Sequence, residues 1–428
     1  MSDTNTKASP QITMILAFVL TIAIMAALLV VTAMIPKDAI KSNTLKSAGY
    51  LAEKQLYPLM ADGVDGSRID VYADSILLNI IYSYDSSDPV TSVAKSAYFF
   101  RQDQDENLNL LEAVTNDMRP NQQYLRYWHG SSVIIRPLLT VLSLPQIYVF
   151  NAIVMIILYA WFAVAAHRSG NTLLAVGMAV ALIMTRIWYV PLCLEYTWIF
   201  LILPVASVLA LGLAGRRDDK LPLLFMIVGM VTNYLDFLTC ETLTLLVPLL
   251  ITIYVAAKDR KDTGRIVKTS ARASAAWLSG YALTWIAKWI FAALILRENV
   301  MPYVSGHISE RIGRDLGIGT FRYLTGAVFY NFTCLFPLRH SFWSMIGFAL
   351  IVIAFFYFGY VYKRPGENLR LIALYALIGA VPIVRFLLLH NHSYLHCFFA
   401  YRALAALVFS VVMIIGELTG QREGAADE

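Results

Sequence analysis

The chain has 428 residues, of which 58% are hydrophobic and only 15% are charged, and its mean hydropathy is +0.61. This composition excludes an ordinary water-soluble domain, and continuous rather than alternating apolar runs exclude a β-barrel. The net charge of +5 does not indicate a nucleic-acid partner, because the basic residues lie in short segments between apolar runs, where they set membrane orientation. The sequence therefore predicts an all-α polytopic membrane protein.

Ten apolar runs are long enough to predict membrane spans. In chain order they cover residues 12–35, 145–167, 171–192, 194–214, 221–239, 242–257, 271–296, 341–362, 368–389 and 398–418. Lys and Arg gather in every second connection, such as 216–220 and 258–272, whereas the connections 193–197, 236–242 and 390–397 contain none. The excess of positive charge on cytoplasmic loops then places both chain ends in the cytoplasm.

Two long connections, residues 37–144 and 297–340, fall on the outer side of a single transmembrane domain that is expected to cover residues 1–428. Their length makes the outer side the place where chemistry is expected. In the first connection, apolar spacing predicts interfacial amphipathic helices at 42–57, 71–82 and 131–144, and polarity predicts a loop at 100–123.

The predicted cytoplasmic connections are too short to form a nucleotide-binding domain, and no P-loop or GxGxxG pattern occurs. Substrates must therefore be available at the outer face or within the bilayer. Six of the seven histidines and most candidate carboxylates also fall on the outer side of the predicted topology.

Asp70 and Asp74 are the candidate catalytic residues. They are four residues apart in IDVYADSILLN, so a helix would present both carboxylates on one face. Such a pair could supply a general base or hold a divalent cation, Mg²⁺ or Mn²⁺, and the need for a cation is left open. The competing interpretation is a solvated pair of surface carboxylates.

Five further charged residues lie near outer helix ends and are predicted to bind substrate: Glu195, Asp236, Glu241, Arg385 and Arg402. Carboxylates at this depth are costly unless they are paired or face water, which makes them functional candidates. The planar guanidinium of an arginine matches a phosphate group. The alternatives are helix caps for the acids, and ion pairs with those acids or snorkelling for the arginines.

Outer histidines and aromatic residues complete the predicted substrate-binding set, with His390, His392 and His396 in HNHSYLHC and Trp128 and His129 in YLRYWHG. No metal site is predicted, because the histidines lack the spacing of a zinc enzyme. Hydrogen bonds to sugar hydroxyls or to a phosphate are favoured instead. The aromatic residues either form the interfacial belt or also stack on sugar rings.

The strings DVYADSILLN, RYWHGSSVIIRPLL, NYLDFLTCETLTLLVPL and HNHSYLHCFFAYRAL, together with the outer carboxylates, resemble a family of bacterial membrane proteins within the GT-C class of glycosyltransferases. This resemblance implies transfer of a sugar from a polyprenyl-phosphate carrier to an extracytoplasmic glycan, lipid or protein, at the bacterial cytoplasmic membrane. It also implies an acidic base in the first outer loop, which would be Asp70 or Asp74. The chain departs from common members because only Asp38 closely follows the first span.

An inverting displacement is the mechanism that these residues favour. A carboxylate would deprotonate the acceptor while Arg385 or Arg402 stabilises the departing polyprenyl phosphate. Two other functions stay open: a transporter or flippase for a lipid-linked or small polar substrate, and a membrane acyltransferase. The sequence shows neither inverted repeats for the former nor room to bind acyl-CoA for the latter.

Overall fold

The computed structural model describes residues 9–259, 261–312, 317–335 and 369–419, together with positions 346, 349, 350, 353 and 357. Every regular element within these residues is a helix, and the only β structure there is two isolated bridges. The all-α prediction is therefore confirmed for the described part of the chain, whereas the span predicted at 341–362 lies largely outside it.

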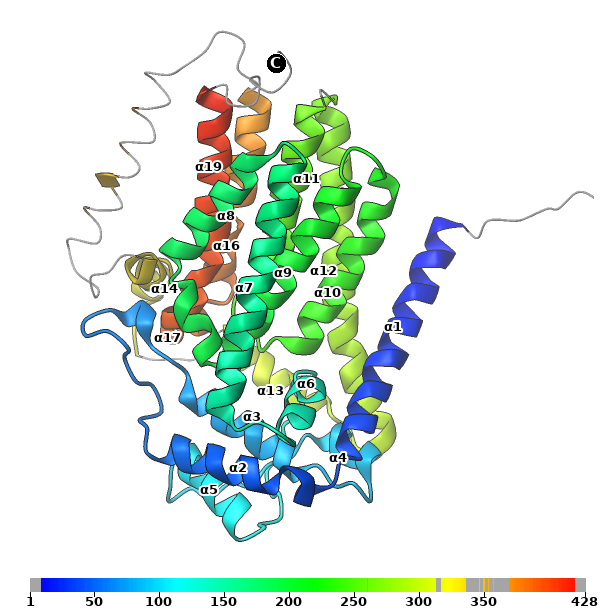
Figure 1. The fold of residues 1–428 in the computed structure, drawn as a ribbon, viewed down its shortest axis with the longest axis vertical. Coiled ribbons are helices and arrows are strands. Elements are labelled where there is room, and N and C mark those ends of the chain that lie inside the picture. The colour runs from blue at the N-terminus through cyan, green and yellow to red at the C-terminus, as the bar shows by residue number, and fades with distance from the viewer. Residues whose placement is uncertain are drawn as a thin grey trace, which may run out of the picture.

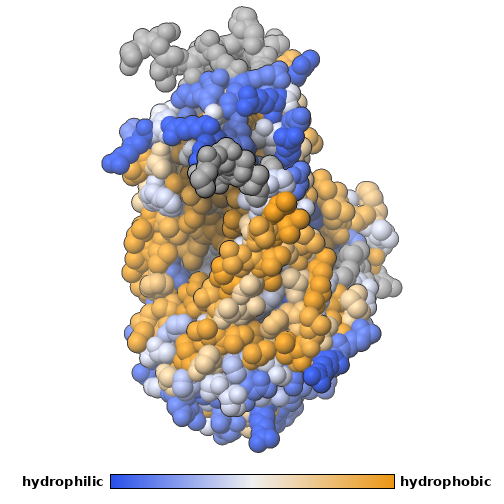
Figure 2. Space-filling model, turned by 90° about the vertical axis from the view of Figure 1, so that its right-hand side faces the viewer, coloured by the Kyte–Doolittle hydropathy of each residue, from blue (hydrophilic) through white to orange (hydrophobic). Residues whose placement is uncertain are grey.

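Six helical segments are long and apolar enough to cross a membrane. They are α1 (Pro10–Ala33), α7 (Leu144–Arg168), α9 (Leu194–Leu213), α12 (Thr263–Leu296), α16 (Leu369–Leu388) and the run formed by α18 (Cys397–Ala400), η4 (Tyr401–Leu404) and α19 (Ala405–Thr419). An apolar belt lies between two polar ends of the molecule (Figure 2). The chain is thus a multi-pass membrane protein.

Three predicted spans appear as shorter helices of the same bundle: α8 (Thr172–Met184), α10 (Leu221–Leu235) and α11 (Leu243–Lys258). The 3-10 helix η2 (Ile187–Leu192) follows α8, and η3 (Asp218–Lys220) precedes α10. The predicted total of ten spans therefore stays a prediction.

The first long connection folds into a helical layer that closes one end of the bundle (Figure 1). It contains α2 (Lys37–Ala52), η1 (Asp65–Ser67), α3 (Val71–Ser83), α4 (Pro89–Lys95), α5 (Glu106–Thr115) and α6 (Ser132–Leu138). The predicted helix at 71–82 is present as α3, but the prediction that it lies at the membrane interface is wrong, because α3 is buried on nearly all sides. A helix lying at an interface would keep one face in contact with lipid headgroups.

The prediction of a polar loop at 100–123 is also wrong, since α5 lies within it. Asp105 caps this helix by accepting a hydrogen bond from the Leu108 N–H at 2.9 Å. Leu110, Ala113 and Val114 then bury one face of the helix. These apolar positions recur every three to four residues, but the surrounding acidic residues obscure the pattern.

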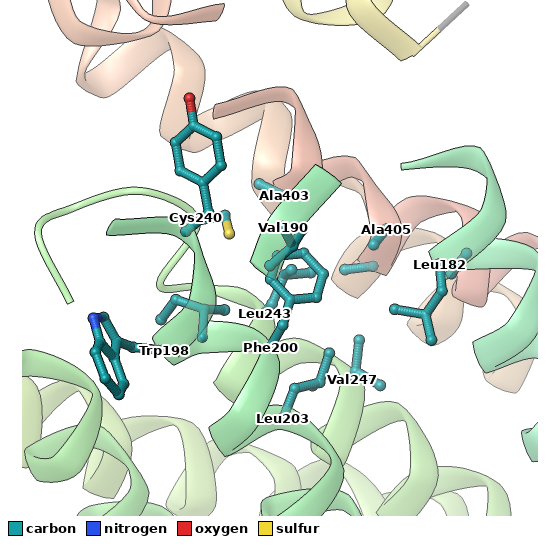
Figure 3. Packing of buried hydrophobic residues seen from close by; sticks show 14 of the residues in the cluster. Leu182, Val190, Trp198, Phe200, Leu203, Cys240, Leu243, Val247, Ala403 and Ala405 are labelled. Carbon is teal, nitrogen blue, oxygen red and sulfur yellow. The ribbon is translucent and has the colours of Figure 1, made fainter. Parts of the chain in front are cut away.

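The remaining described helices are α13 (Met301–Ile312) and α14 (Thr320–Leu335) in the second long connection, and α17 (His390–Leu395) between α16 and α18. At the centre of the bundle, Phe200 and Leu203 of α9 pack near Val247 of α11 and Ala405 of α19 (Figure 3). This dense packing fixes the helix ends that form the site described below.

Helices α10 and α12 cross at two glycines. A Cβ atom on Gly229 would overlap the backbone oxygen of Trp277, and one on Gly280 would overlap that of Met226. Only glycine therefore permits this approach, which resembles small-residue packing in other membrane bundles.

We expect Gly229→Ala to lower the free energy of unfolding by about 1–3 kcal/mol, because the added methyl group must push the two helices apart. Gly212→Ala on α9 is the matched control, since a Cβ atom there would meet nothing within 4 Å. Unfolding in a denaturant series would compare the variants. Equal stabilities would show that the crossing tolerates a side chain.

Candidate functional site

A cavity of about 90 Å³ lies where the helical layer meets the end of the bundle. It brings together five of the predicted site residues, namely Asp70, His129, Glu195, His392 and His396. These residues come from four separate parts of the sequence. Aromatic and apolar side chains complete the lining: Tyr57, Tyr72, Ala73, Ile76, Leu77, Ile80, Tyr124, Tyr127, Phe237 and Phe399. We call this cavity the polar pocket.

Asp70 is held at the entry to α3 by its own backbone. The Ile69 and Val71 N–H groups donate to the carbonyl oxygens of Pro58 and Leu56, both at 3.0 Å, so the backbone on either side of Asp70 is tied to the segment 56–58. The Asp70 Oδ1 accepts a hydrogen bond from the Ala73 N–H at 2.9 Å and caps the helix. The side chain, only 3% exposed, lines the polar pocket.

The carboxyl groups of Asp70 and Glu195 both line the polar pocket and influence each other there. Burial raises the pKa of Asp70 from 3.8 to about 7, although the Ala73 N–H and Glu195 act in the opposite direction. Glu195 lies in the first turn of α9, where the helix dipole favours negative charge. A carboxylate with such a pKa suits a general base near neutral pH.

His129 faces this pair with a neutral imidazole. Its backbone adopts a left-handed conformation, with φ of 55°, and its Nε2 lies 3.2 Å from the Tyr124 carbonyl oxygen. The pKa of His129 is lowered to about 3, mainly by burial and also by the nearby Lys288 and Arg126, while the bond to Tyr124 acts in the opposite direction. Nε2 therefore donates its proton to Tyr124, which leaves Nδ1 as an acceptor, and this Nδ1 is buried without a partner. A substrate hydroxyl would satisfy it.

His392 and His396 form the opposite side of the polar pocket, with ring centroids 5.0 Å apart. The His396 ring stacks on Phe399 at 5.3 Å. Within the part of the chain that the structure describes, no group of three or more His, Cys, Asp or Glu side chains is arranged to hold a metal ion. No step below depends on a metal.

Asp74, the other candidate base, does not line the polar pocket. It is fully buried and accepts hydrogen bonds from the Tyr148 hydroxyl and, at 2.8 Å, from the Leu194 N–H. The Cys193 thiol also donates to it at 3.5 Å. These donors belong to α7 and to the start of α9, so Asp74 joins α3 to two membrane-spanning helices.

The predicted phosphate ligand Arg385 has a carboxylate partner within the protein. Its Nε and Nη2 atoms donate to the Glu241 carboxylate at 2.7 and 2.8 Å, and both side chains are buried. Nη2 also contacts the carbonyl oxygens of Leu238 and Thr239, in a turn that the Asp236 carboxylate shapes by accepting from the Thr239 hydroxyl at 2.6 Å. Asp236, Glu241 and Arg385 therefore form one buried network beside the pocket wall at Phe237.

The remaining predicted ligands lie in packed surroundings. Arg402 is 1% exposed, stacks on Tyr196 with 4.6 Å between its Cζ and the ring centroid, and contacts the carbonyl oxygen of Gly66. Trp128 is fully buried and donates its indole N–H to the Thr284 carbonyl oxygen at 2.8 Å. His390 packs edge-on against Tyr323, with ring centroids 4.9 Å apart. None of these three lines the polar pocket.

An aromatic groove of about 320 Å³ begins at the pocket wall, and sequence reasoning missed it. Its floor is a ladder on α12 in which aromatic residues recur every four positions: Trp277, Tyr281, Trp285 and Trp289. Successive ring centroids lie 5.0, 5.9 and 5.8 Å apart. Their spacing was visible in the sequence, because residues four apart share a helix face.

Tyr127 connects the groove to the polar pocket, since it lines both. Its ring stacks on Trp285 at 6.0 Å and meets Phe237 edge-on at 5.5 Å. Arg126 lies in the groove beside this wall, with its guanidinium 5.3 Å from the Tyr127 ring centroid. The site thus joins a polar pocket, a cation and an apolar groove.

No family model, curated protein or solved structure matches this sequence.

Proposed function

We propose that the chain is a membrane glycosyltransferase that moves a sugar from a polyprenyl-phosphate carrier to an acceptor hydroxyl. One observation carries this proposal: a polar pocket lined by the carboxyl groups of Asp70 and Glu195 adjoins, at Tyr127, an aromatic groove on a membrane-spanning helix. A polyprenyl-phosphate sugar has the same order of parts, a polar headgroup followed by a long apolar chain.

The donor would lie with its isoprenoid chain on the α12 ladder and its sugar in the polar pocket. Its phosphate would then fall near Arg126, at the junction of the two. The Arg126 guanidinium is held between aromatic rings, 5.1 Å from the Tyr124 centroid and 5.3 Å from that of Tyr127. Because Arg385 is already paired with Glu241, Arg126 is the better candidate for contact with the phosphate.

In the reaction, Asp70 would accept the proton of the acceptor hydroxyl as its oxygen forms a bond to the anomeric carbon. The bond between that carbon and the phosphate oxygen breaks with its electron pair, and polyprenyl phosphate leaves. Burial sets the pKa of Asp70 near neutrality while Glu195 acts to lower it, and Nδ1 of His129 orients a hydroxyl. Attack from the face opposite the leaving group inverts the anomeric configuration.

The proposal also places the protein in a bacterial cytoplasmic membrane with ten spans and cytoplasmic chain ends. The basic connections support this orientation, which puts the helical layer and the polar pocket on the outer side. Sugars attached to polyprenyl carriers would then meet acceptors of the cell envelope there.

Lipid retention tests the donor assignment. We expect gently solubilised wild-type protein to carry a polyprenyl phosphate, free or glycosylated. Trp285→Ala and Arg126→Gln should retain about tenfold less, because one loses ring contact with the chain and the other loses the phosphate contact. Trp161→Ala is the matched control, since this exposed tryptophan lies on the membrane-spanning helix α7, outside the groove. Mass spectrometry of the extracted lipid would give the amounts and the headgroup mass.

Only bulk phospholipid, at equal levels in all four proteins, would contradict the assignment. A flippase or an acyltransferase would then fit the groove better.

A further inference from the structure

A second hollow adjoins the polar pocket. It is a cleft of about 460 Å³, and it shares Tyr57 and His396 with the pocket. Its other lining residues are Asp65, Arg68, Tyr330, Tyr394, Leu395, Cys397 and Phe398. The proposed function assigns no role to this cleft, which is about five times as large as the polar pocket.

A positioned guanidinium forms part of the cleft. Arg68 donates to the Tyr57 carbonyl oxygen at 2.9 Å and to the Asp65 carboxylate at 3.3 Å, and its Cζ lies 5.8 Å from the Phe398 ring centroid. The Arg68 side chain is 24% exposed, so part of it can contact a ligand. The turn that carries Asp65 is itself fixed, because the Gly66 carbonyl oxygen accepts a hydrogen bond from Tyr401 at 3.0 Å.

Aromatic rings form the walls. Tyr330 and Tyr394 are hydrogen-bonded to each other, and their ring centroids lie 4.9 Å apart. Tyr394 can occupy this position because α14 has a glycine beneath it: a Cβ atom on Gly326 would lie 2.7 Å from the Tyr394 ring. On the opposite side, Tyr57 meets Phe398 edge-on at 5.9 Å. These ring contacts hold the two walls of the cleft in place.

We propose that this cleft binds the acceptor and that the acceptor is a glycan, an inference that rests on the proposed function. Aromatic faces pack against the C–H faces of sugar rings, while the Arg68 and Asp65 side chains can bond hydroxyl groups. The position of the cleft agrees with this role, because a glycan that extends past Tyr57 and His396 would bring its terminal hydroxyl to Asp70.

The contrast with the aromatic groove decides against a second lipid chain. The groove is floored by a ladder of aromatic residues on the membrane-spanning helix α12. Arg126 and Glu241 also border the groove, but the surface that the groove exposes is almost entirely apolar. A larger share of the surface exposed in the cleft is polar, and its lining includes the Arg68–Asp65 ion pair and three tyrosines, groups that an alkyl chain would strip of water without replacing their hydrogen bonds. A molecule with both apolar faces and hydroxyl groups suits this lining.

Saturation-transfer NMR of the purified full-length protein with maltotriose, chitotriose and mannotriose would test the proposal. We expect wild type to bind at least one of these trisaccharides. Tyr394→Ala should bind it about three- to tenfold more weakly, the effect of one lost ring contact, and Arg68→Gln should also weaken binding. Tyr394→Phe should retain most of the affinity, because the ring remains. Trp161→Ala is the control outside the cleft, and thermal unfolding of each variant would show that it is folded.

The proposal is overturned if wild type binds none of the three trisaccharides, or if Tyr394→Ala and Arg68→Gln bind them as wild type does. The outcome is separable from that of the proposed function. Trisaccharide binding that depends on Tyr394, in a protein that retains no polyprenyl phosphate, would support the glycan cleft and refute the donor. A retained polyprenyl phosphate without trisaccharide binding would do the reverse.

Discussion

Asp70→Asn is expected to lower the rate of sugar transfer by about 10²–10⁴-fold, the usual contribution of a general base. The amide keeps the shape of the side chain and can still accept the Ala73 hydrogen bond that caps α3. It cannot take a proton from the acceptor. Single-turnover transfer from bound donor would measure the loss directly, and a rate within a few-fold of wild type would exclude Asp70 as the base.

The pH dependence of sugar transfer should follow the ionisation of Asp70. Burial raises the pKa of Asp70 to about 7, so the basic form is the minor one in acid and the main one in weak alkali. We expect transfer to increase about tenfold per pH unit below pH 7 and to level off above it. Glu195→Ala removes a side chain that acts to lower the pKa of Asp70, so it should displace the midpoint of the profile to higher pH. An unchanged midpoint would show that Glu195 does not influence Asp70.

Asp74→Asn serves as the matched control for Asp70→Asn, because both substitutions remove a buried carboxyl group at the start of α3. Asp74 contacts Tyr148 and Leu194 and not the polar pocket. The expected result is a loss of stability, with transfer per folded molecule largely retained. Loss of sugar transfer in folded Asp74→Asn protein would indicate that Asp74 is the general base.

Arg385→Ala is expected to lower the free energy of unfolding by about 3–5 kcal/mol, because it leaves the Glu241 carboxylate buried without its partner. It also removes the donor to the carbonyl oxygens of Leu238 and Thr239. Denaturant unfolding in the same detergent would measure the difference.

The double variant Arg385→Met with Glu241→Gln separates the ion pair from a phosphate contact. It removes both charges while roughly keeping the side-chain volumes, so it should recover much of the stability that Arg385→Ala loses. It should also keep its bound polyprenyl phosphate, since Arg126 contacts that group in our proposal. A stable double variant that has lost the lipid would show that Arg385, and not Arg126, contacts the phosphate.

The helices were largely predictable because apolar runs are a strong signal, and the predicted spans within the described residues all correspond to helices. The sequence could not predict which of Asp70 and Asp74 lines the polar pocket. Spacing by four residues places both on one face only if both lie inside the helix. The helix begins at Val71, so Asp70 caps it from outside while Asp74 projects into the core.

Contacts between residues distant in sequence also could not be predicted. Arg385 and Glu241 are 144 residues apart, and their ion pair was one of several interpretations open to the sequence. Asp70 and Glu195 likewise meet only because α3 packs beside the start of α9. The ladder on α12 differs, because its repeat of four could have been recognised beforehand. Aromatic residues in a membrane span are common enough to hide it.

The central claim is tested most directly by the state of the lipid bound to wild type and to Asp70→Asn, each purified from membranes that contain the acceptor. The measurement is the mass-spectrometric ratio of glycosylated to free polyprenyl phosphate. We predict that Asp70→Asn traps the glycosylated donor and raises this ratio at least about tenfold, because the slowed step is the one that consumes it. Equal ratios, or no polyprenyl phosphate on either protein, would contradict the account.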